Sequence, residues 1–314
     1  MNRNMKEQKK QIIAVFCLSV VLLMMVGNSS VFLAARSKFQ KPRFYIKLKG
    51  IGNLADGGDF GDFVDRNDIY FNDLNNSPEN YDITVTTPPA YFRGFGGEIG
   101  LETKRYAVGI SAGYIEKKFH LDYHFENEIT GFEDNYVREH KFSAIPIFLL
   151  IHYKIINTSF FAASFTIGQG VYLGTYRDDR EQTFKNYDKT FVNSYVESNQ
   201  ARLGFHLGTT LEIKITRNLG LFAEAAYRLV KFAEMEAKDY YEDDDVVNEN
   251  EGDFYYWTNR RTDEAQFGIG ENTRIYWDSI LAELNLNGFS FSVGIKITFG
   301  SGKEAKPVKI APQD

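Results

Sequence analysis

The feature that most constrains the fold is a strict alternation of apolar residues with polar or small residues in several separate segments. In residues 289–299, Phe, Phe, Val, Ile, Ile and Phe alternate with Ser, Ser, Gly, Lys and Thr. Residues 203–215 show the same alternation. Successive side chains of a β-strand point to opposite faces, whereas a helix would scatter this pattern around its surface. The chain is therefore predicted to be all-β, with strands that each have one apolar face.

Six further segments bring the number of predicted strands to eight. Clear apolar stripes occupy residues 108–114, 145–153 and 161–171. Weaker stripes occupy residues 44–51, 95–101 and 221–229. Pro146 cannot donate a backbone hydrogen bond, so a bulge or the entry of a strand is expected there.

The connections between these strands alternate between short and long. Short turns are expected at residues 103–105, 156–159 and 217–220. Long polar segments lie at about 54–91, 122–140, 174–200 and 236–284. This sorting predicts a closed antiparallel up-and-down transmembrane β-barrel of eight strands, with short periplasmic turns and long extracellular loops. Residues 275–286 also fit an extension of the last strand, a short helix or an additional hairpin, so ten strands remain an alternative.

Alternation alone leaves open which face of each strand points outward. A soluble lipocalin-like barrel would place its apolar stripes inside. The polar faces of these strands, however, contain many Gly, Ser and Thr residues, such as Gly96, Gly109, Ser164 and Gly208, and few charges. Small side chains suit the crowded interior of an eight-stranded barrel, so we expect the apolar faces to contact lipid.

The few large polar residues on the inward faces include both signs of charge. Isolated charges in so narrow a lumen would be costly to desolvate, so we predict an internal salt-bridge network that plugs it. The alternative is that several of these side chains lie at the rims and are hydrated. The candidates are Lys47, Lys49, Glu98, Glu102, His152, Lys154, Arg202, Glu212, Lys214, Glu224, Arg228 and Lys296.

Residues 1–35 have the order of an export signal peptide, with basic residues, the apolar run 12–26, and then Ala34 and Ala35. Cleavage after Ala35 is expected, with an uncleaved anchor as the alternative. Residues 36–300 would form the barrel and residues 301–314 a short polar periplasmic tail. The leader contains four basic residues and one acidic residue, so its removal changes the formal net charge from −6 to about −9 and disfavours nucleic acid as a partner.

The only cysteine, Cys17, lies in the expected leader. The mature chain would then contain no disulfide scaffold, no thiolate metal site and no cysteine nucleophile.

The segment Ser-Val-Gly-Ile-Lys-Ile-Thr-Phe at residues 292–299 resembles the terminal β-signal of outer-membrane proteins, through Ser292, Gly294, Ile297 and Phe299. With the leader and the loop asymmetry, the mature chain resembles the small eight-stranded outer-membrane barrel family that includes opacity-type and outer-membrane-protein-A-type domains. This resemblance implies insertion into a bacterial outer membrane by the barrel assembly machinery. One departure is the tail after Phe299, because the simplest members end at the aromatic residue.

Two acidic regions fit either solvated loops or a divalent-cation site, because hard cations prefer carboxylate clusters. Neither has the spacing of an EF-hand. The carboxylates concerned are Asp56, Asp59, Asp62, Asp243, Asp244 and Asp245.

No His-Glu-x-x-His pair or phosphate-binding loop occurs in the sequence, so we expect a protein without enzymatic activity or cofactor. A lipid-modifying enzyme built on Glu139, His140 and Ser143 is a competing hypothesis. The leading hypothesis is a barrel in contact with outer-membrane lipid that anchors acidic surface loops for envelope integrity or for binding an unidentified surface ligand. A narrow pore and a soluble lipocalin-like carrier are two further hypotheses.

Overall fold

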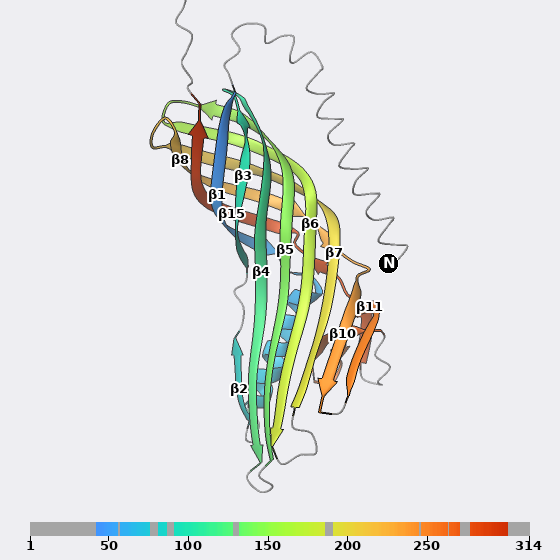
Figure 1. The fold of residues 1–314 in the computed structure, drawn as a ribbon. Coiled ribbons are helices and arrows are strands. Elements are labelled where there is room, and N and C mark those ends of the chain that lie inside the picture. The colour runs from blue at the N-terminus through green and yellow to red at the C-terminus, as the bar shows by residue number, and fades with distance from the viewer. Residues whose placement is uncertain are drawn as a thin grey trace, which may run out of the picture.

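The computed structural model describes residues 42–55, 57–75, 81–86, 91–127, 132–185, 191–244, 246–262, 264–270 and 277–300. The expected leader and tail lie outside these ranges. Within them, eight antiparallel strands form a closed ring, in which the first strand pairs with the last (Figure 1). The ring order is β1 (Arg43–Ala55), β3 (Phe92–Glu102), β4 (Tyr106–Asn127), β5 (Phe132–Asn157), β6 (Phe161–Lys185), β7 (Phe191–Lys214), β8 (Leu219–Leu229) and β15 (Gly288–Phe299). The predicted closed β-barrel is confirmed.

Four strands continue far beyond the ring, so the expectation of loops over most of residues 122–140 and 174–200 is wrong. Strands β4, β5, β6 and β7 contain 22, 26, 25 and 24 residues. Many of their inward positions remain apolar beyond the barrel, for example at Phe119 and Leu121 of β4 and Tyr176 of β6, which are all buried. Polar outward residues in between give these strand extensions the composition of loops.

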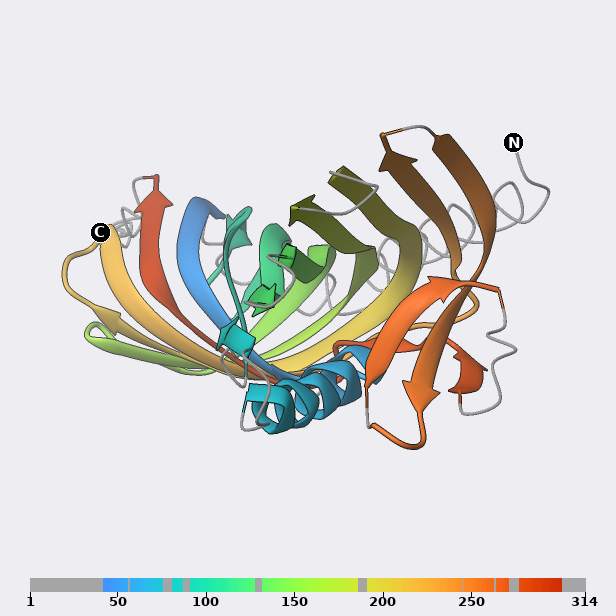
Figure 2. The same ribbon diagram turned by 90° about the horizontal axis from the view of Figure 1, so that it is seen from below.

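The strand extensions form one wall of a second structured region, which we call the head (Figure 1). Its other elements are α2 (Asp59–Asn75), β2 (Tyr81–Thr86), β9 (Lys231–Phe232), β10 (Glu236–Asp243), β11 (Val247–Asn259), β12 (Ala265–Ile269), β13 (Trp277–Leu281) and β14 (Leu284–Asn285). Strand β10 adds to β7, and β11 adds to β10. Helix α2 lies alongside the curved sheet (Figure 2). Among the described residues, no helix is long and apolar enough to cross a membrane.

Within the ambiguous segment 275–286, β13 pairs with β11 and β14 pairs with β9, and both pairs belong to the head. Over the described residues, the barrel ring therefore keeps eight strands. Pro146 lies in the middle of β5 rather than at a strand entry, and the β4–β5 register is the same on both sides of it. The expected bulge is absent there; the register shift in β5 lies between Lys154 and Ile156, against β6.

A continuous apolar belt surrounds the outside of the ring. One residue from each ring strand illustrates it, with exposed fractions between 41% and 67%. These residues are Leu48, Ile99, Ile110, Ile147, Ile167, Leu207, Leu221 and Val293. A water-soluble protein rarely exposes so large a contiguous apolar surface, whereas lipid requires one. The belt therefore identifies the membrane-facing surface of a transmembrane barrel.

Exposed aromatic pairs mark the two edges of the belt. At the end with the short turns, Phe44 lies 5.8 Å from Phe299 between ring centroids, and Tyr106 lies 5.4 Å from Tyr153. At the head end, Tyr227 and Phe289 lie 5.1 Å apart. Aromatic side chains favour the membrane–water interface, so these pairs fit the girdles of a membrane barrel.

A charge placed in the belt should destabilise the barrel, and the same charge on the head should not. Because Ile110 lies at mid-belt on β4, we expect Ile110→Arg to lower the unfolding free energy in lipid by about 2–4 kcal/mol. His120→Arg lies on the same outward face of β4 but in the head, and serves as the matched control. Urea titration of the heat-modifiable form on gels measures both. Equal stability of Ile110→Arg and wild type would contradict the assignment of the belt.

Candidate functional site: the barrel lumen and its mouth

Glu98 of β3 is the centre of a buried cluster in the lumen. Lys47 Nζ lies 3.0 Å from one carboxylate oxygen, and His152 Nε2 lies 2.7 Å from the other, which also accepts the hydroxyl of Tyr45. The second ring nitrogen of His152 contacts Thr166 Oγ1 at 2.8 Å. These residues come from four strands, because the ring closes their inward faces onto one space.

Gly109 of β4 makes room for this cluster. A Cβ atom there would lie 2.5 Å from the hydroxyl oxygen of Tyr45 and 2.8 Å from a carboxylate oxygen of Glu98. Both distances are too short for a carbon contact, so only glycine allows the tyrosine and the glutamate to meet. This is the use that the sequence pattern predicted for small inward residues.

A second cluster surrounds Glu102 near the end with the short turns. Its carboxylate accepts hydrogen bonds from Lys154, Lys296 and Arg43, each at 2.7 Å. Lys296 also donates to Glu212 at 2.8 Å. Glu102 is 1% exposed, so the cations compensate for its lost hydration.

A third pair lies closer to the head. Lys49 Nζ donates to Glu224 at 3.1 Å, and Thr210 Oγ1 lies 3.5 Å from the other carboxylate oxygen. His206 Nε2 lies 3.6 Å from Glu224. The alternation in the sequence places Lys49, Glu224 and Glu98 on inward faces but does not predict which side chains pair.

Three of the candidate lumen residues do not join a carboxylate. Arg202 donates to the carbonyl oxygen of Ala233, and Lys214 donates to Asn157 and to the carbonyl oxygen of Thr158. Arg228 has no carboxylate partner in the part of the chain that the structure describes. Lys214 is partly exposed at the short-turn rim, which fits the hydrated alternative for that residue.

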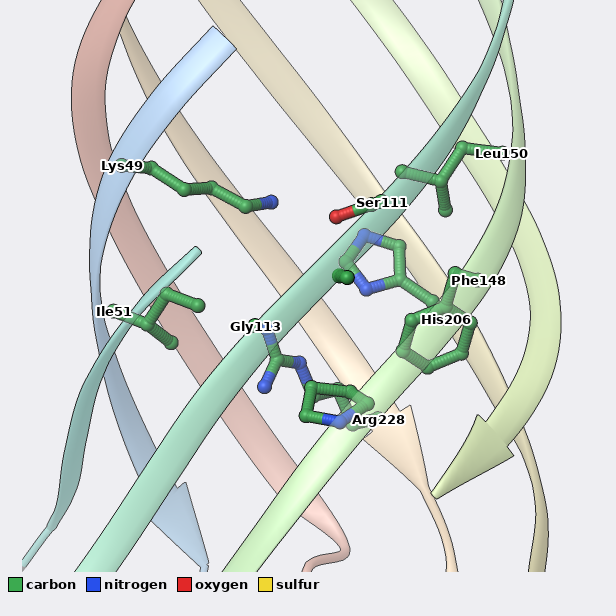
Figure 3. Close-up of a pocket in the computed structure, with 10 residues that line it drawn as sticks. Lys49, Ile51, Ser111, Gly113, Phe148, Leu150, His206 and Arg228 are labelled. Carbon is green, nitrogen blue, oxygen red and sulfur yellow. The ribbon is translucent and has the colours of Figure 1, made fainter. Parts of the chain in front are cut away.

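Little space remains between these side chains. One cavity, lined among others by Lys49, Ser111, His206 and Arg228, has a volume of about 10 Å³ (Figure 3). This volume accommodates about one water molecule. Side chains of β1, β4, β5, β7 and β8 line this cavity.

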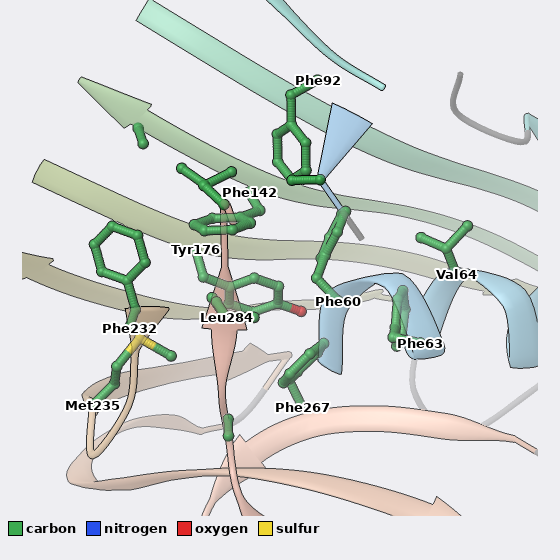
Figure 4. Close-up of a cluster of buried hydrophobic side chains, with 14 of the residues drawn as sticks. Phe60, Phe63, Val64, Phe92, Phe142, Tyr176, Phe232, Met235, Phe267 and Leu284 are labelled. Atoms are coloured by element: carbon green, nitrogen blue, oxygen red, sulfur yellow. The ribbon is translucent and has the colours of Figure 1, made fainter. Parts of the chain in front are cut away.

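An aromatic cluster closes the mouth of the barrel on the head side (Figure 4). Phe142 of β5 lies at its centre, 5.5 Å from Phe92 of β3, 6.1 Å from Phe60 of α2 and 5.8 Å from Phe232 of β9, measured between ring centroids. All four rings are buried. Because they come from opposite sides of the mouth and from the helix, they form an apolar layer above the charged lumen.

Hydrogen bonds fix helix α2 in this position. The backbone amide of Asp59 donates to the carbonyl oxygen of Glu283 at 2.8 Å, and its carboxylate accepts the amide of Glu283 at 2.5 Å. Tyr256 donates to Asp62 at 2.6 Å, and Asn67 donates to the carbonyl oxygen of Ala265 at 3.0 Å. Burial raises the pKa of Asp59 to about 6.

The acidic residues considered for a cation site are not gathered in one loop. Asp59 and Asp62 lie in the first turn of α2, where carboxylates stabilise the helix N-terminus. Asp243, at the end of β10, accepts the amide of Val246 at 2.9 Å and the hydroxyl of Tyr241 at 3.0 Å, and Asp244 follows it in the turn. Asp56 and Asp245 lie outside the described residues. No group of three metal-ligating side chains occurs within the described ranges.

The residues considered for catalysis are not brought together. His140 is fully buried on the inward face of β5, and its Nδ1 lies 2.7 Å from the hydroxyl of Tyr176. Glu139 lies on the outward face and pairs with Lys118 at 3.0 Å. Ser143 shares that outward face, so the strand separates it from His140. The expected cluster of these three residues is wrong.

The head contains a buried ion cluster that the sequence analysis missed. Arg138 donates to both carboxylate oxygens of Asp178, at 2.9 and 2.7 Å, and Arg180 donates to one of them at 2.6 Å. Burial alone would raise the pKa of Asp178, but the charges of Arg138 and Arg180 outweigh it and lower that pKa. Burial lowers the pKa of His140 well below its usual range. The residues were overlooked because these segments were interpreted as loops.

Strand β15 carries the residues that resemble the assembly signal. Ser292 is buried on the inward face, whereas Phe299 is exposed on the outward face beside Phe44 of β1. Gly294 shares the inward face and Ile297 the outward face. These four residues lie in the strand that closes the ring, and their role in assembly remains a prediction.

No family model and no curated protein matches the sequence. Among solved structures, the outer membrane protein OprG from Pseudomonas aeruginosa is 11% identical, with 83% of this chain and 98% of that chain covered and a TM-score of 0.38. A major outer membrane protein from Thermus thermophilus is 12% identical, with 82% and 99% covered and a TM-score of 0.39. CarO from Acinetobacter baumannii is 13% identical, with 70% and 96% covered and a TM-score of 0.28. These TM-scores are too low to support an assignment. The barrel assignment therefore rests on the strand ring and the apolar belt.

Neutralising Glu98 should destabilise the barrel. In Glu98→Gln, Lys47 would stay buried without its counter-charge, so we expect a loss of about 3 kcal/mol in unfolding free energy. Glu251→Gln is the control, because its partner Lys238 and Glu251 are both exposed on the head. Thermal unfolding in detergent micelles measures the difference. A Glu98→Gln variant as stable as wild type would show that the cluster contributes nothing to stability.

Asp178 should make the head sensitive to acid. Its pKa is lower in the folded chain than the ordinary value of 3.8, so its ionised form stabilises the folded head above about pH 4. This stabilisation declines as the pH falls below 4, toward the lowered pKa. We therefore expect the difference in melting temperature between wild type and Asp178→Asn to be large at pH 7 and to shrink between pH 4 and pH 2. A difference independent of pH would contradict the ion cluster.

Proposed function

We propose that this chain is a non-enzymatic bacterial outer-membrane protein whose filled barrel anchors a folded head at the cell surface. The observation that carries the proposal is the closure of the lumen at two levels. Ion pairs centred on Glu98 and Glu102 link adjacent and next-but-one strands inside the lumen, and the aromatic layer around Phe142 covers its mouth. A permanently filled barrel serves as a membrane anchor rather than as a passage.

The proposed orientation places the short turns in the periplasm and the head outside the cell. Outer-membrane barrels have short periplasmic turns and longer extracellular connections. The short connections of this ring, at residues 103–105, 158–160 and 215–218, all lie at one end, and the head lies at the other. Residues 36–300 are proposed as the barrel with its head, exported by residues 1–35 and inserted by the barrel assembly machinery.

The folded head supports a role in surface interaction or envelope integrity. Its core rings, among them Phe63, Tyr176 and Phe267, are fully buried, and Phe63 lies 5.4 Å from Phe267 between ring centroids. A packed core fixes the relative positions of the exposed side chains around it. A preorganised surface binds a partner with a smaller loss of conformational entropy than mobile loops do.

A pore and a lipid-modifying enzyme have less support. A narrow pore would require the side chains around Glu98 and Glu102 to leave a continuous water path and the aromatic layer to move. A lipid-modifying enzyme built on His140 and Ser143 would require two side chains that lie on opposite faces of β5.

Conductance of the purified chain in planar lipid bilayers tests the filled barrel. We expect no channel steps at any applied voltage up to the limit of the bilayer, because ion pairs and aromatic rings occupy the lumen. A general porin inserted under the same conditions is the positive control, and heat-modifiable migration confirms that the inserted protein is folded. Reproducible single-channel steps from the folded protein would replace the anchor with a pore.

A further inference from the structure

The part of the lumen next to the mouth contains a buried arginine without a counter-ion. Arg228 of β8 is 2% exposed, and its Nε and Nη1 atoms have no hydrogen-bond partner among the described residues. Glu224, on the same strand and the same face, is already held by Lys49 at 3.1 Å. A guanidinium group stays charged in proteins, and a buried charge without a partner is strongly unfavourable.

The positive charges of the described lumen exceed the negative charges. Apart from Arg43, Arg202 and Lys214, five buried or nearly buried cations face four carboxylates. The cations are Lys47, Lys49, Lys154, Lys296 and Arg228, and the carboxylates are Glu98, Glu102, Glu212 and Glu224. Every lysine in this set contacts a carboxylate, so within the set the unmatched positive charge belongs to Arg228. Protonation of His206 would increase the excess.

The space beside Arg228 fits a small anion. Lys49 of β1 and Arg228 of β8, on strands separated only by β15, line the cavity of about 10 Å³ together with His206 (Figure 3). His206 lies directly opposite Arg228 across the β7–β8 pair, and its Nε2 atom has no hydrogen-bond partner in the described part of the chain. Phe148 and Leu150 form the apolar part of the wall.

We propose that this cavity binds one chloride-sized monovalent anion. The unpartnered atoms of Arg228 can only donate hydrogen bonds, which excludes a cation as the occupant. The volume admits a single atom of about the size of water, which excludes phosphate and larger carboxylates. A water molecule would fit but would leave the charge of Arg228 unbalanced. The bound anion balances the charge of Arg228 and stabilises the folded barrel.

Thermal unfolding in sodium chloride and in sodium gluconate at equal ionic strength tests the site. Gluconate is too large for the cavity, so we expect the wild type to melt several degrees higher in chloride. In Arg228→Gln this chloride-specific increase should disappear. Arg202→Gln is the matched control and should keep the increase, because Arg202 donates to the carbonyl oxygen of Ala233 and does not line the cavity.

A direct measurement on the wild type keeps the proposal testable if Arg228→Gln fails to fold. Crystals of the wild type grown in bromide should show an anomalous scattering peak between Arg228 and Lys49. A peak there, together with the chloride-specific increase, supports the site. Equal melting in chloride and gluconate, an increase that persists in Arg228→Gln, or a cavity without an anomalous peak would each overturn the proposal and leave water as the occupant.

Discussion

The rest of the structure depends on the requirement that every backbone polar group inside a lipid layer be hydrogen-bonded within the protein. Strands meet this requirement only when the sheet closes on itself, as β15 does by pairing with β1. Closure then separates the two faces of each strand completely. Apolar residues such as Ile110 and Val293 form the outer belt, and every alternate residue is forced into a narrow lumen.

The narrowness of the lumen in turn limits which polar residues the inward faces can contain. Glycines such as Gly109 leave room for larger neighbours, and a large charged inward residue is costly without a partner because bulk water has little access. Glu98 and Glu102 therefore each accept hydrogen bonds from several side chains of other strands. These contacts hold the strands in register from inside, while the aromatic layer around Phe142 continues the packing into the head.

The sequence was sufficient for the parts of the fold governed by alternation. The eight ring strands, the short turns and the inward positions of Lys47, Glu98 and Lys296 follow directly from period-two patterns. The contacts between inward side chains of different strands could not be predicted from these patterns. They depend on the shear of the barrel and on which strands are neighbours. The head was missed because strands outside the membrane have polar outer faces, although the alternating Phe119, Leu121 and Tyr123 carried a signal for it. Helix α2 lies in a segment whose acidic, glycine-rich start resembled a loop.

The most direct test of a filled, covered lumen is the reactivity of a single cysteine inside it. In a chain with Cys17→Ser, Ser111→Cys places a thiol on the inward face of β4, where the native side chain is 6% exposed. Lys238→Cys on the head is the exposed control. With a water-soluble maleimide on outer membranes, we predict rapid labelling of residue 238 and no labelling of residue 111 until the barrel is unfolded by heat. Rapid labelling of residue 111 in the folded protein would contradict the closed lumen.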